Sequence, residues 1–83
     1  MDIRRQILDV LETVLSLQGR TAGFRDGTPL LGAIPELDSM AVVSVIAALE
    51  DRLGVVFDDD EIDGSTFATV GSLVDLVARK VAS

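Results

Sequence analysis

The sequence contains neither cysteine nor histidine. Without cysteine, the chain can form no disulfide bridge and no thiolate metal site. Without histidine, it lacks the commonest general base of enzymes and a common ligand of metal ions. We therefore expect no catalytic site and no metal site, and the composition argues against a self-contained enzyme.

Long hydrophobic runs are also missing. The longest nearly apolar stretch, residues 40–49, is too short for a membrane-spanning helix, which needs about 20 residues. Residues 1–5 become amphipathic at once and lack the apolar block of a signal peptide. A chain of 83 residues is enough for one small domain. We expect a single cytoplasmic domain, residues 1–83, that does not insert into a membrane.

Basic residues are scarce in one segment. The formal net charge is −7, and residues 36–63 hold nine acidic residues against one basic residue, Arg52. Nucleic acid is then an unsuitable partner, because phosphate binding requires clusters of lysine and arginine. A basic protein surface would be attracted instead, by a field that salt weakens. An acidic surface can also serve solubility alone, but the concentration of charge in one segment favours a docking role.

Apolar periodicity predicts a first helix over about residues 2–18, ended by Gly19. Its apolar face consists of Ile3, Ile7, Val10, Leu11, Val14 and Leu17. Residues 19–37 show no helical period and contain four glycines and both prolines, which predicts a long extended loop. Five apolar residues should hold this loop against the helices: Phe24, Leu30, Leu31, Ile34 and Leu37. A short helical turn is possible near residues 30–33.

A second helix is predicted from Ser39 to about Leu53, where Gly54 ends it. Asp38 immediately precedes the apolar pattern and is a suitable N-cap. Ser39 then becomes the first helical residue, at the positive end of the helix dipole, where a phosphate on its hydroxyl would be favourably placed.

Two sides of this second helix are apolar. The predicted core face comprises Val42, Val45, Ile46, Leu49 and Leu53. A weaker stripe on another side ends in two acids and comprises Met40, Val43, Ala47, Glu50 and Asp51. Exposed apolar residues bordered by acids indicate a small interaction surface, although single exposed apolar residues are common on any protein.

The acidic run at residues 58–63 follows a loop, residues 55–57, whose apolar side chains should enter the core. If Asp59 began an EF-hand loop, the twelfth position would fall on Val70, where calcium binding requires a glutamate. A calcium-binding module is therefore the weaker interpretation. We expect these acids to cap a short third helix near residues 63–67 or to face a basic partner.

The last helix should begin after Thr69, a plausible N-cap, and carry Val70, Leu73, Val74, Val77 and Val81 on one face. Asp75 and Arg79 should form an i,i+4 pair outside. The predicted fold is thus all-α, a four-helix bundle of three long helices and one short helix with a long first loop.

Asp38-Ser39-Met40 follows a first helix and a long loop and begins the second helix, and in this position it resembles the attachment motif of the acyl and peptidyl carrier proteins. The resemblance also includes residues 48–54, residues 55–57, and Thr69 with Val70 before the last helix. It implies a carrier-protein bundle in which Ser39 receives 4′-phosphopantetheine from coenzyme A. The thiol of this arm would hold an acyl or aminoacyl group as a thioester, and the carrier itself would not be an enzyme.

The same resemblance implies partners for a bacterial, monomeric, stand-alone carrier. These are a phosphopantetheinyl transferase, a ligase that loads the acyl or aminoacyl group, and acyl-processing enzymes with basic docking surfaces. The residues expected to meet them are Asp38, Met40, Val43, Ala47, Glu50 and Asp51. The alternative function, from a different class, is a non-covalent acidic helical adaptor.

One departure from the family's pattern concerns the pathway. Carriers of fatty acid synthesis usually have acids two and five residues after the serine, where this chain has Ala41 and Ser44. The Leu-Asp-Ser-Met form is closer to D-alanyl and peptidyl carriers and to carriers of specialised bacterial pathways, such as those of exosortase and exopolysaccharide loci.

Overall fold

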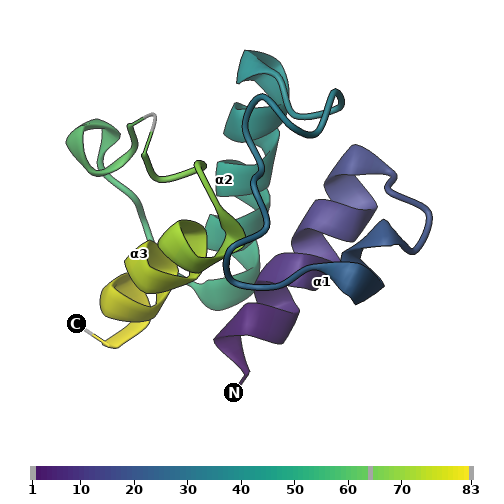
Figure 1. Ribbon diagram of the computed structural model, residues 1–83. Coiled ribbons are helices and arrows are strands. Elements are labelled where there is room, and N and C mark those ends of the chain that lie inside the picture. The colour runs from purple at the N-terminus through teal and green to yellow at the C-terminus, as the bar shows by residue number, and fades with distance from the viewer. Residues whose placement is uncertain (1, 64, 83) are drawn as a thin grey trace.

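The computed structural model describes residues 2–63 and 65–82, without the side chain of Asp59. It contains three α-helices and two short 3-10 helices within these residues (Figure 1). In chain order they are α1 (Ile3–Leu15), η1 (Arg20–Gly23), α2 (Ser39–Leu53), η2 (Asp59–Glu61) and α3 (Val70–Ala82). The all-α prediction is confirmed. A short third helix was expected near residues 63–67; of these, residues 65–67 form a hydrogen-bonded turn instead, which follows the 3-10 helix η2.

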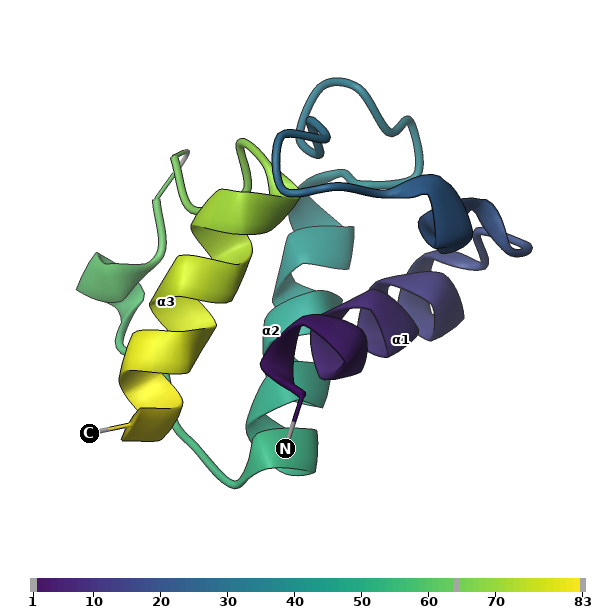
Figure 2. The ribbon, with the colours of Figure 1, turned by 60° about the horizontal axis from the view of Figure 1, so that its bottom comes forward.

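The core lies where α1 packs on both α2 and α3 (Figure 2). Each helix contributes side chains that are completely buried: Ile7 and Leu11 from α1, Val45 and Leu49 from α2, and Leu73 and Val77 from α3. These residues recur at spacings of three or four, so one face of each helix is removed from water.

Helix α1 ends three residues earlier than predicted. Ser16 takes the left-handed conformation at the C-cap, with φ 54°, and Leu17 is buried beyond the helix. The Glu12 carboxylate explains the turn, because it accepts hydrogen bonds from the Gly19 N–H at 2.9 Å and the Thr21 hydroxyl at 2.9 Å. The Gly19 bond lowers the pKa of Glu12, aided by Thr21 and partly opposed by desolvation.

The core face of α2 is centred differently from the prediction. Val45 and Leu49 are fully buried, whereas Val42, Ile46 and Leu53 are only partly buried at its edge. The predicted set of residues is therefore in contact with the core, but Val42 and Ile46 keep part of their surface outside.

The long loop crosses the bundle and pairs with the beginning of α3. The N–H groups of Leu30 and Leu31 donate to the carbonyls of Ala68 and Phe67, at 3.0 and 2.9 Å. Pro29 forms an isolated antiparallel bridge with Thr69. These backbone bonds join segments about forty residues apart, and periodicity did not predict them.

Side chains of the loop complete this attachment. Leu30, Ile34 and Leu37 are buried as expected and Phe24 is partly buried, but Leu31 is 44% exposed. The predicted turn near residues 30–33 is present, since the N–H groups of Ala33 and Ile34 both donate to the Leu30 carbonyl.

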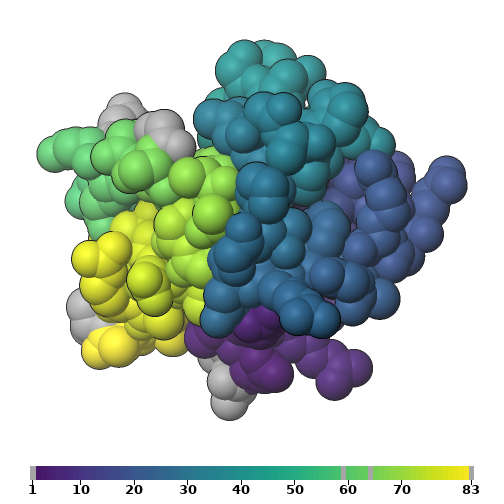
Figure 3. Space-filling model, viewed as in Figure 1, coloured from purple at the N-terminus to yellow at the C-terminus, as the bar shows by residue number. Residues whose placement is uncertain are grey.

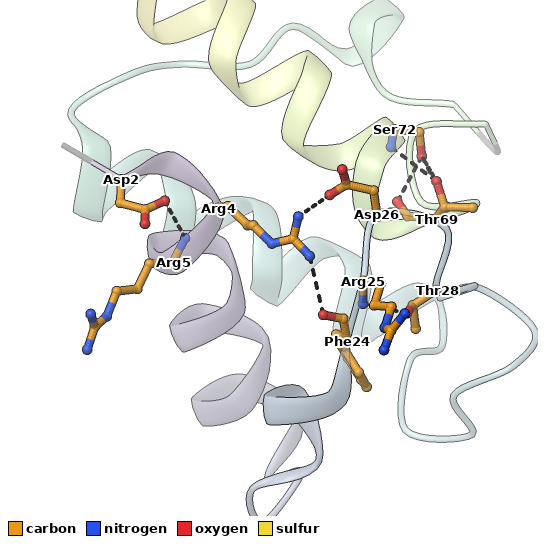
Figure 4. A network of polar contacts seen from close by, with 9 residues as sticks. All are labelled: Asp2, Arg4, Arg5, Phe24, Arg25, Asp26, Thr28, Thr69 and Ser72. Atoms are coloured by element: carbon orange, nitrogen blue, oxygen red, sulfur yellow. Dashed lines mark hydrogen bonds and ion pairs between the residues drawn. The ribbon is translucent and has the colours of Figure 1, made fainter.

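A polar network fixes the loop to the first turns of both α1 and α3 (Figure 4). Arg4 pairs with the Asp26 carboxylate and donates to the Phe24 carbonyl at 3.3 Å. The Asp26 carbonyl in turn accepts from the Gly71 N–H at 2.7 Å. Thus one loop residue contacts two helices.

Thr69 is the N-cap of α3, as predicted. Its hydroxyl accepts from the Ser72 N–H and the Ser72 hydroxyl accepts from the Thr69 N–H, each at 3.1 Å. Reciprocal bonds of this kind satisfy two backbone donors at the helix start. At the other end of α3, Arg79 Nε donates to the Asp75 carbonyl at 3.3 Å, so the contact in the structure is to the backbone of Asp75 instead of the predicted charge pair.

The segment between α2 and α3 enters the core through Phe57, while Val56 is 72% exposed, contrary to the expectation that both would enter. Asp63 Oδ1 accepts from the N–H groups of Ser65 and Thr66, so it caps the turn as predicted. The Asp59 side chain and Gly64, which the calcium interpretation needs, lie outside the described residues. Among those described, no three acidic side chains gather in a way that could hold a metal ion.

We predict that Gly71→Ala destabilises the fold. A Cβ at this position would lie 2.9 Å from the Asp26 carbonyl oxygen, and backbone atoms cannot move away without disturbing the loop. Overpacking of this kind costs about 1–3 kcal/mol, measurable by urea unfolding. The matched control is Gly23→Ala, where a Cβ meets nothing within 4 Å. Equal stability of the two variants would contradict the proposed close contact.

We also predict that Glu12 stabilises the fold only when it is ionised. Its pKa in the folded protein is lowered from the ordinary value of 4.5. Its contribution is therefore fully present above about pH 4.5 and is lost as the pH falls through the folded-state pKa. Urea unfolding should show Glu12→Gln less stable than the wild type near pH 7, with the difference shrinking near pH 3. A difference that stayed constant over this range would disprove the role of the charge.

Candidate functional site

Ser39 is the first residue of α2, and its side chain is exposed. The preceding residue, Asp38, has extended backbone angles and is the N-cap, as predicted. Its Oδ1 accepts from the Ala41 N–H at 2.8 Å, and its carbonyl accepts from the Val42 N–H at 2.9 Å. The first turn of α2 forms one tip of the molecule beside the long loop (Figure 3). Another macromolecule can therefore approach the hydroxyl of Ser39.

A pocket of about 270 Å³ lies beside this serine. Its walls come from three separate parts of the chain: Leu31 of the loop, Ser39 and Val42 of α2, and Ile62, Asp63 and Phe67 from the segment before α3. Apart from Ser39 and Asp63, the lining side chains are hydrocarbon. The pocket can therefore accept an apolar group close to the serine.

A second pocket, of about 360 Å³, adjoins the first along α2. It is lined by Val42, Val43, Ile46, Ala47, Glu50 and Ile62. Because both pockets share Val42 and Ile62, they form one depression that we call the α2 groove. Sequence reasoning missed this groove, since it placed Val42 and Ile46 in the core and could not locate Ile62.

Most of the predicted recognition residues are at the surface. Met40 is 75% and Val43 63% exposed, and Ala47, Asp38 and Asp51 are exposed as well. These side chains share α2 with Ser39, so the structure brings the predicted stripe and the serine together on one helix. Two of these residues, Val43 and Ala47, also line the α2 groove.

Glu50 differs from the other predicted residues. It is half-buried, and its Oε2 accepts the Phe57 N–H at 2.8 Å. The carboxylate therefore holds the segment that follows α2 and also forms the end of the groove. The sequence analysis assigned Glu50 only to partner recognition, but its carboxylate also stabilises the fold through Phe57.

The charges around the site are partly neutralised. Arg20 pairs with Glu36 near the start of α2, and Lys80 Nζ lies 2.6 Å from Glu61 Oε1. The Lys80 contact lowers the pKa of Glu61, and Glu61 correspondingly raises the pKa of Lys80. Beside Ser39, the pKa of Asp63 is lowered by the hydroxyl and N–H of Ser65 and by the Thr66 N–H. The Asp63 carboxylate, which lines the pocket beside Ser39, is therefore ionised at neutral pH.

Within residues 2–63 and 65–82, none of the helices has the length and hydrophobicity that crossing a membrane requires.

Comparisons with known proteins agree with this geometry. The sequence model of the family described as "Phosphopantetheine attachment site" matches residues 5–77. Among solved structures, the NMR structure of a holo acyl carrier protein from Nitrosomonas europaea is similar over 100% of both chains, with 44% sequence identity and a TM-score of 0.92. No curated protein matches the chain.

A match over residues 5–77 includes all of α2 and its capped start, and the structural similarity extends to the whole fold. The chain therefore belongs to the phosphopantetheine-binding acyl carrier proteins, a family of carriers that are not themselves enzymes.

Proposed function

We propose that Ser39 is the residue to which 4′-phosphopantetheine is attached, and that the thiol of this arm carries an acyl or aminoacyl group as a thioester. The observation that supports this most directly is the exposed Ser39 side chain, at a capped helix start and beside an apolar groove. Ser39 also lies within the residues that the family's sequence model matches.

Three other serines of the chain, Ser44, Ser65 and Ser72, fit an attachment role less well. The Ser65 hydroxyl donates to Asp63 at 2.6 Å, and the Ser72 hydroxyl donates to the Thr66 carbonyl at 2.9 Å. Modifying either hydroxyl would break a contact that caps a turn or a helix. Ser44 is exposed but lies inside α2, away from the positive helix end that favours a phosphate.

The chemistry of attachment would come from a phosphopantetheinyl transferase. The Ser39 oxygen would attack the phosphorus of coenzyme A that bears pantetheine, so that the new phosphate ester forms as the pyrophosphate P–O bond breaks and adenosine 3′,5′-bisphosphate leaves. The serine proton would pass to a base of the transferase, because this chain has no histidine. Asp38 would contribute by capping α2 and presenting Ser39 to the transferase, since its carboxylate is already bonded to the Ala41 N–H.

The proposed recognition face consists of Asp38, Met40, Val43, Ala47, Glu50 and Asp51. It combines three exposed apolar side chains with acids, which suits enzymes that have basic docking surfaces. We infer that these partners include the transferase, a loading ligase and acyl-processing enzymes. Contacts of this small size would be weak and reversible, so that the carrier can leave each enzyme.

For the pathway, we propose a monomeric stand-alone carrier, residues 1–83, that works in the bacterial cytoplasm and resembles D-alanyl, peptidyl or other specialised carriers. The support for a specialised carrier is the replacement of two expected acids by Ala41 and Ser44. Ser44 is exposed, so this part of α2 offers partners a hydroxyl in place of a charge.

We predict that incubation with coenzyme A and a broad-specificity transferase adds the mass of one phosphopantetheine to the intact protein. Ser39→Ala should abolish the addition completely, because the accepting oxygen is lost. Ser44→Ala, an exposed serine on the same helix, should be modified like the wild type. Addition to Ser39→Ala, or no addition to a folded wild type with several active transferases, would refute the assignment.

We predict that Asp51→Lys lowers kcat/KM for this modification about three- to tenfold at low salt, because it reverses an exposed charge on the recognition face. The effect should weaken at high salt, where such charges are screened. Asp75→Lys makes the same reversal on the exposed side of α3 and serves as the control. Equal effects of both variants would show that net charge matters and the face does not.

A further inference from the structure

Residues 57–63, which we call the strap, contribute to the outer wall of the α2 groove through Ile62 and Asp63. Ile62 is the strap residue that lines both pockets of the groove, opposite Val42. It is half-buried and packs against the edge of the core. The position of the strap therefore determines the width of the groove.

The strap is attached to α2 at its first residue. The Phe57 N–H donates to Glu50 Oε2 at 2.8 Å, and the Phe57 ring is buried, with 7% of its surface exposed. Separating this end from α2 would expose an aromatic side chain and leave a backbone donor without its partner. This attachment is consequently costly to open.

The middle of the strap is attached to α3 by a different kind of contact. Lys80 Nζ donates to Glu61 Oε1 at 2.6 Å, with 23% and 29% of the two side chains exposed. The same Glu61 oxygen accepts the Asp58 N–H at 2.9 Å, which folds the strap around the carboxylate. Glu61 immediately precedes Ile62, so this ion pair holds the groove wall.

The surroundings of the ion pair allow it to open. A hollow of about 360 Å³ is lined by Glu61, Leu76, Arg79 and Lys80, so the pair borders open space as well as packed side chains. Partly exposed ion pairs contribute little to global stability. Opening would move charged groups into water and would leave Phe57 in the core.

We propose that the Lys80–Glu61 ion pair is a latch that holds the strap against α3, and that its release opens the α2 groove while the helical core stays folded. Thr66 limits the movement at the far end, because its buried hydroxyl donates to the Glu61 carbonyl at 3.3 Å. Lys80 is therefore a positioning residue for the groove. The inference concerns the strap alone and does not depend on what is attached to Ser39.

The test is amide hydrogen exchange, followed by NMR on the full chain without an attached arm. Lys80→Met keeps most of the aliphatic stem and removes the charge. It should speed exchange of the Asp58 and Glu61 amides about two- to fivefold, as loss of a partly exposed ion pair would give. Core amides such as those of Val45 and Leu73 should exchange as in the wild type.

Two further variants separate the latch from general effects of charge. Arg79 lines the same hollow, and Arg79→Met removes its positive charge while Lys80 stays in place. This variant should not change the exchange rates of the strap amides. In the double variant Lys80→Met/Glu61→Gln, exchange should rise by less than the combined effects of Lys80→Met and Glu61→Gln, because the two residues share the Lys80–Glu61 contact.

A second measurement tests the opening of the groove. Nile red is a neutral apolar dye, so the acids of the groove do not repel it, and its fluorescence should rise more with Lys80→Met than with Arg79→Met. Unchanged strap exchange in Lys80→Met would overturn the proposal. An equal rise in exchange at Val45 and Leu73 would also overturn it, since the ion pair would then stabilise the whole fold. Faster strap exchange without added dye fluorescence would overturn the link between the latch and the groove.

Discussion

The structure depends on the backbone pairing between the long loop and the start of α3. Four backbone hydrogen bonds connect residues 26–31 with residues 67–71, and the loop ends where α2 begins. The pairing fixes Leu31 and Phe67 side by side, and these residues form two walls of the pocket next to Ser39. The close approach of the Asp26 carbonyl leaves no room for a side chain at residue 71, and glycine satisfies this constraint. Although the loop is long, these contacts make it a fixed connection between the start of α2 and the start of α3.

How much of this was visible in the sequence differs from one element to the next. The three α-helices and the caps at Asp38 and Thr69 follow from local patterns, because apolar periodicity and capping chemistry involve neighbouring residues. The predicted end of α1 lay three residues too late, since the turn is closed by the Glu12 carboxylate, whose contacts with Gly19 and Thr21 follow from no local sequence pattern. The loop pairing could not be predicted at all, because each strand-like segment is too short to show a period and its partner is about forty residues away.

The candidate site shows the same division. The proposed attachment serine and the exposed stripe of α2 could be predicted from the sequence, because both are properties of one helix and its cap. The α2 groove could not, because Ile62 and Phe67 come from a segment without regular structure. The periodicity of α2 even pointed away from it: Val42 and Ile46 have the spacing of core residues, and they are partly buried because one side of each faces the groove. A residue at the boundary between core and pocket has the same sequence pattern as a core residue.

The acidic segment also divides into charges with different uses. A carboxylate that accepts backbone N–H groups keeps its full charge, as Asp38, Glu50 and Asp63 do, and it therefore contributes both to the fold and to the field around the site. A carboxylate paired with a base is locally neutral, as Glu36 is with Arg20 and Glu61 with Lys80. The segment's own base, Arg52, is turned toward Asp9 of α1, at 3.9 Å. Helix α2, where Ser39 and the proposed recognition residues lie, therefore keeps the negative charges of Asp38 and Glu50, whereas Glu61 of the strap is neutralised by Lys80 where it holds the groove wall.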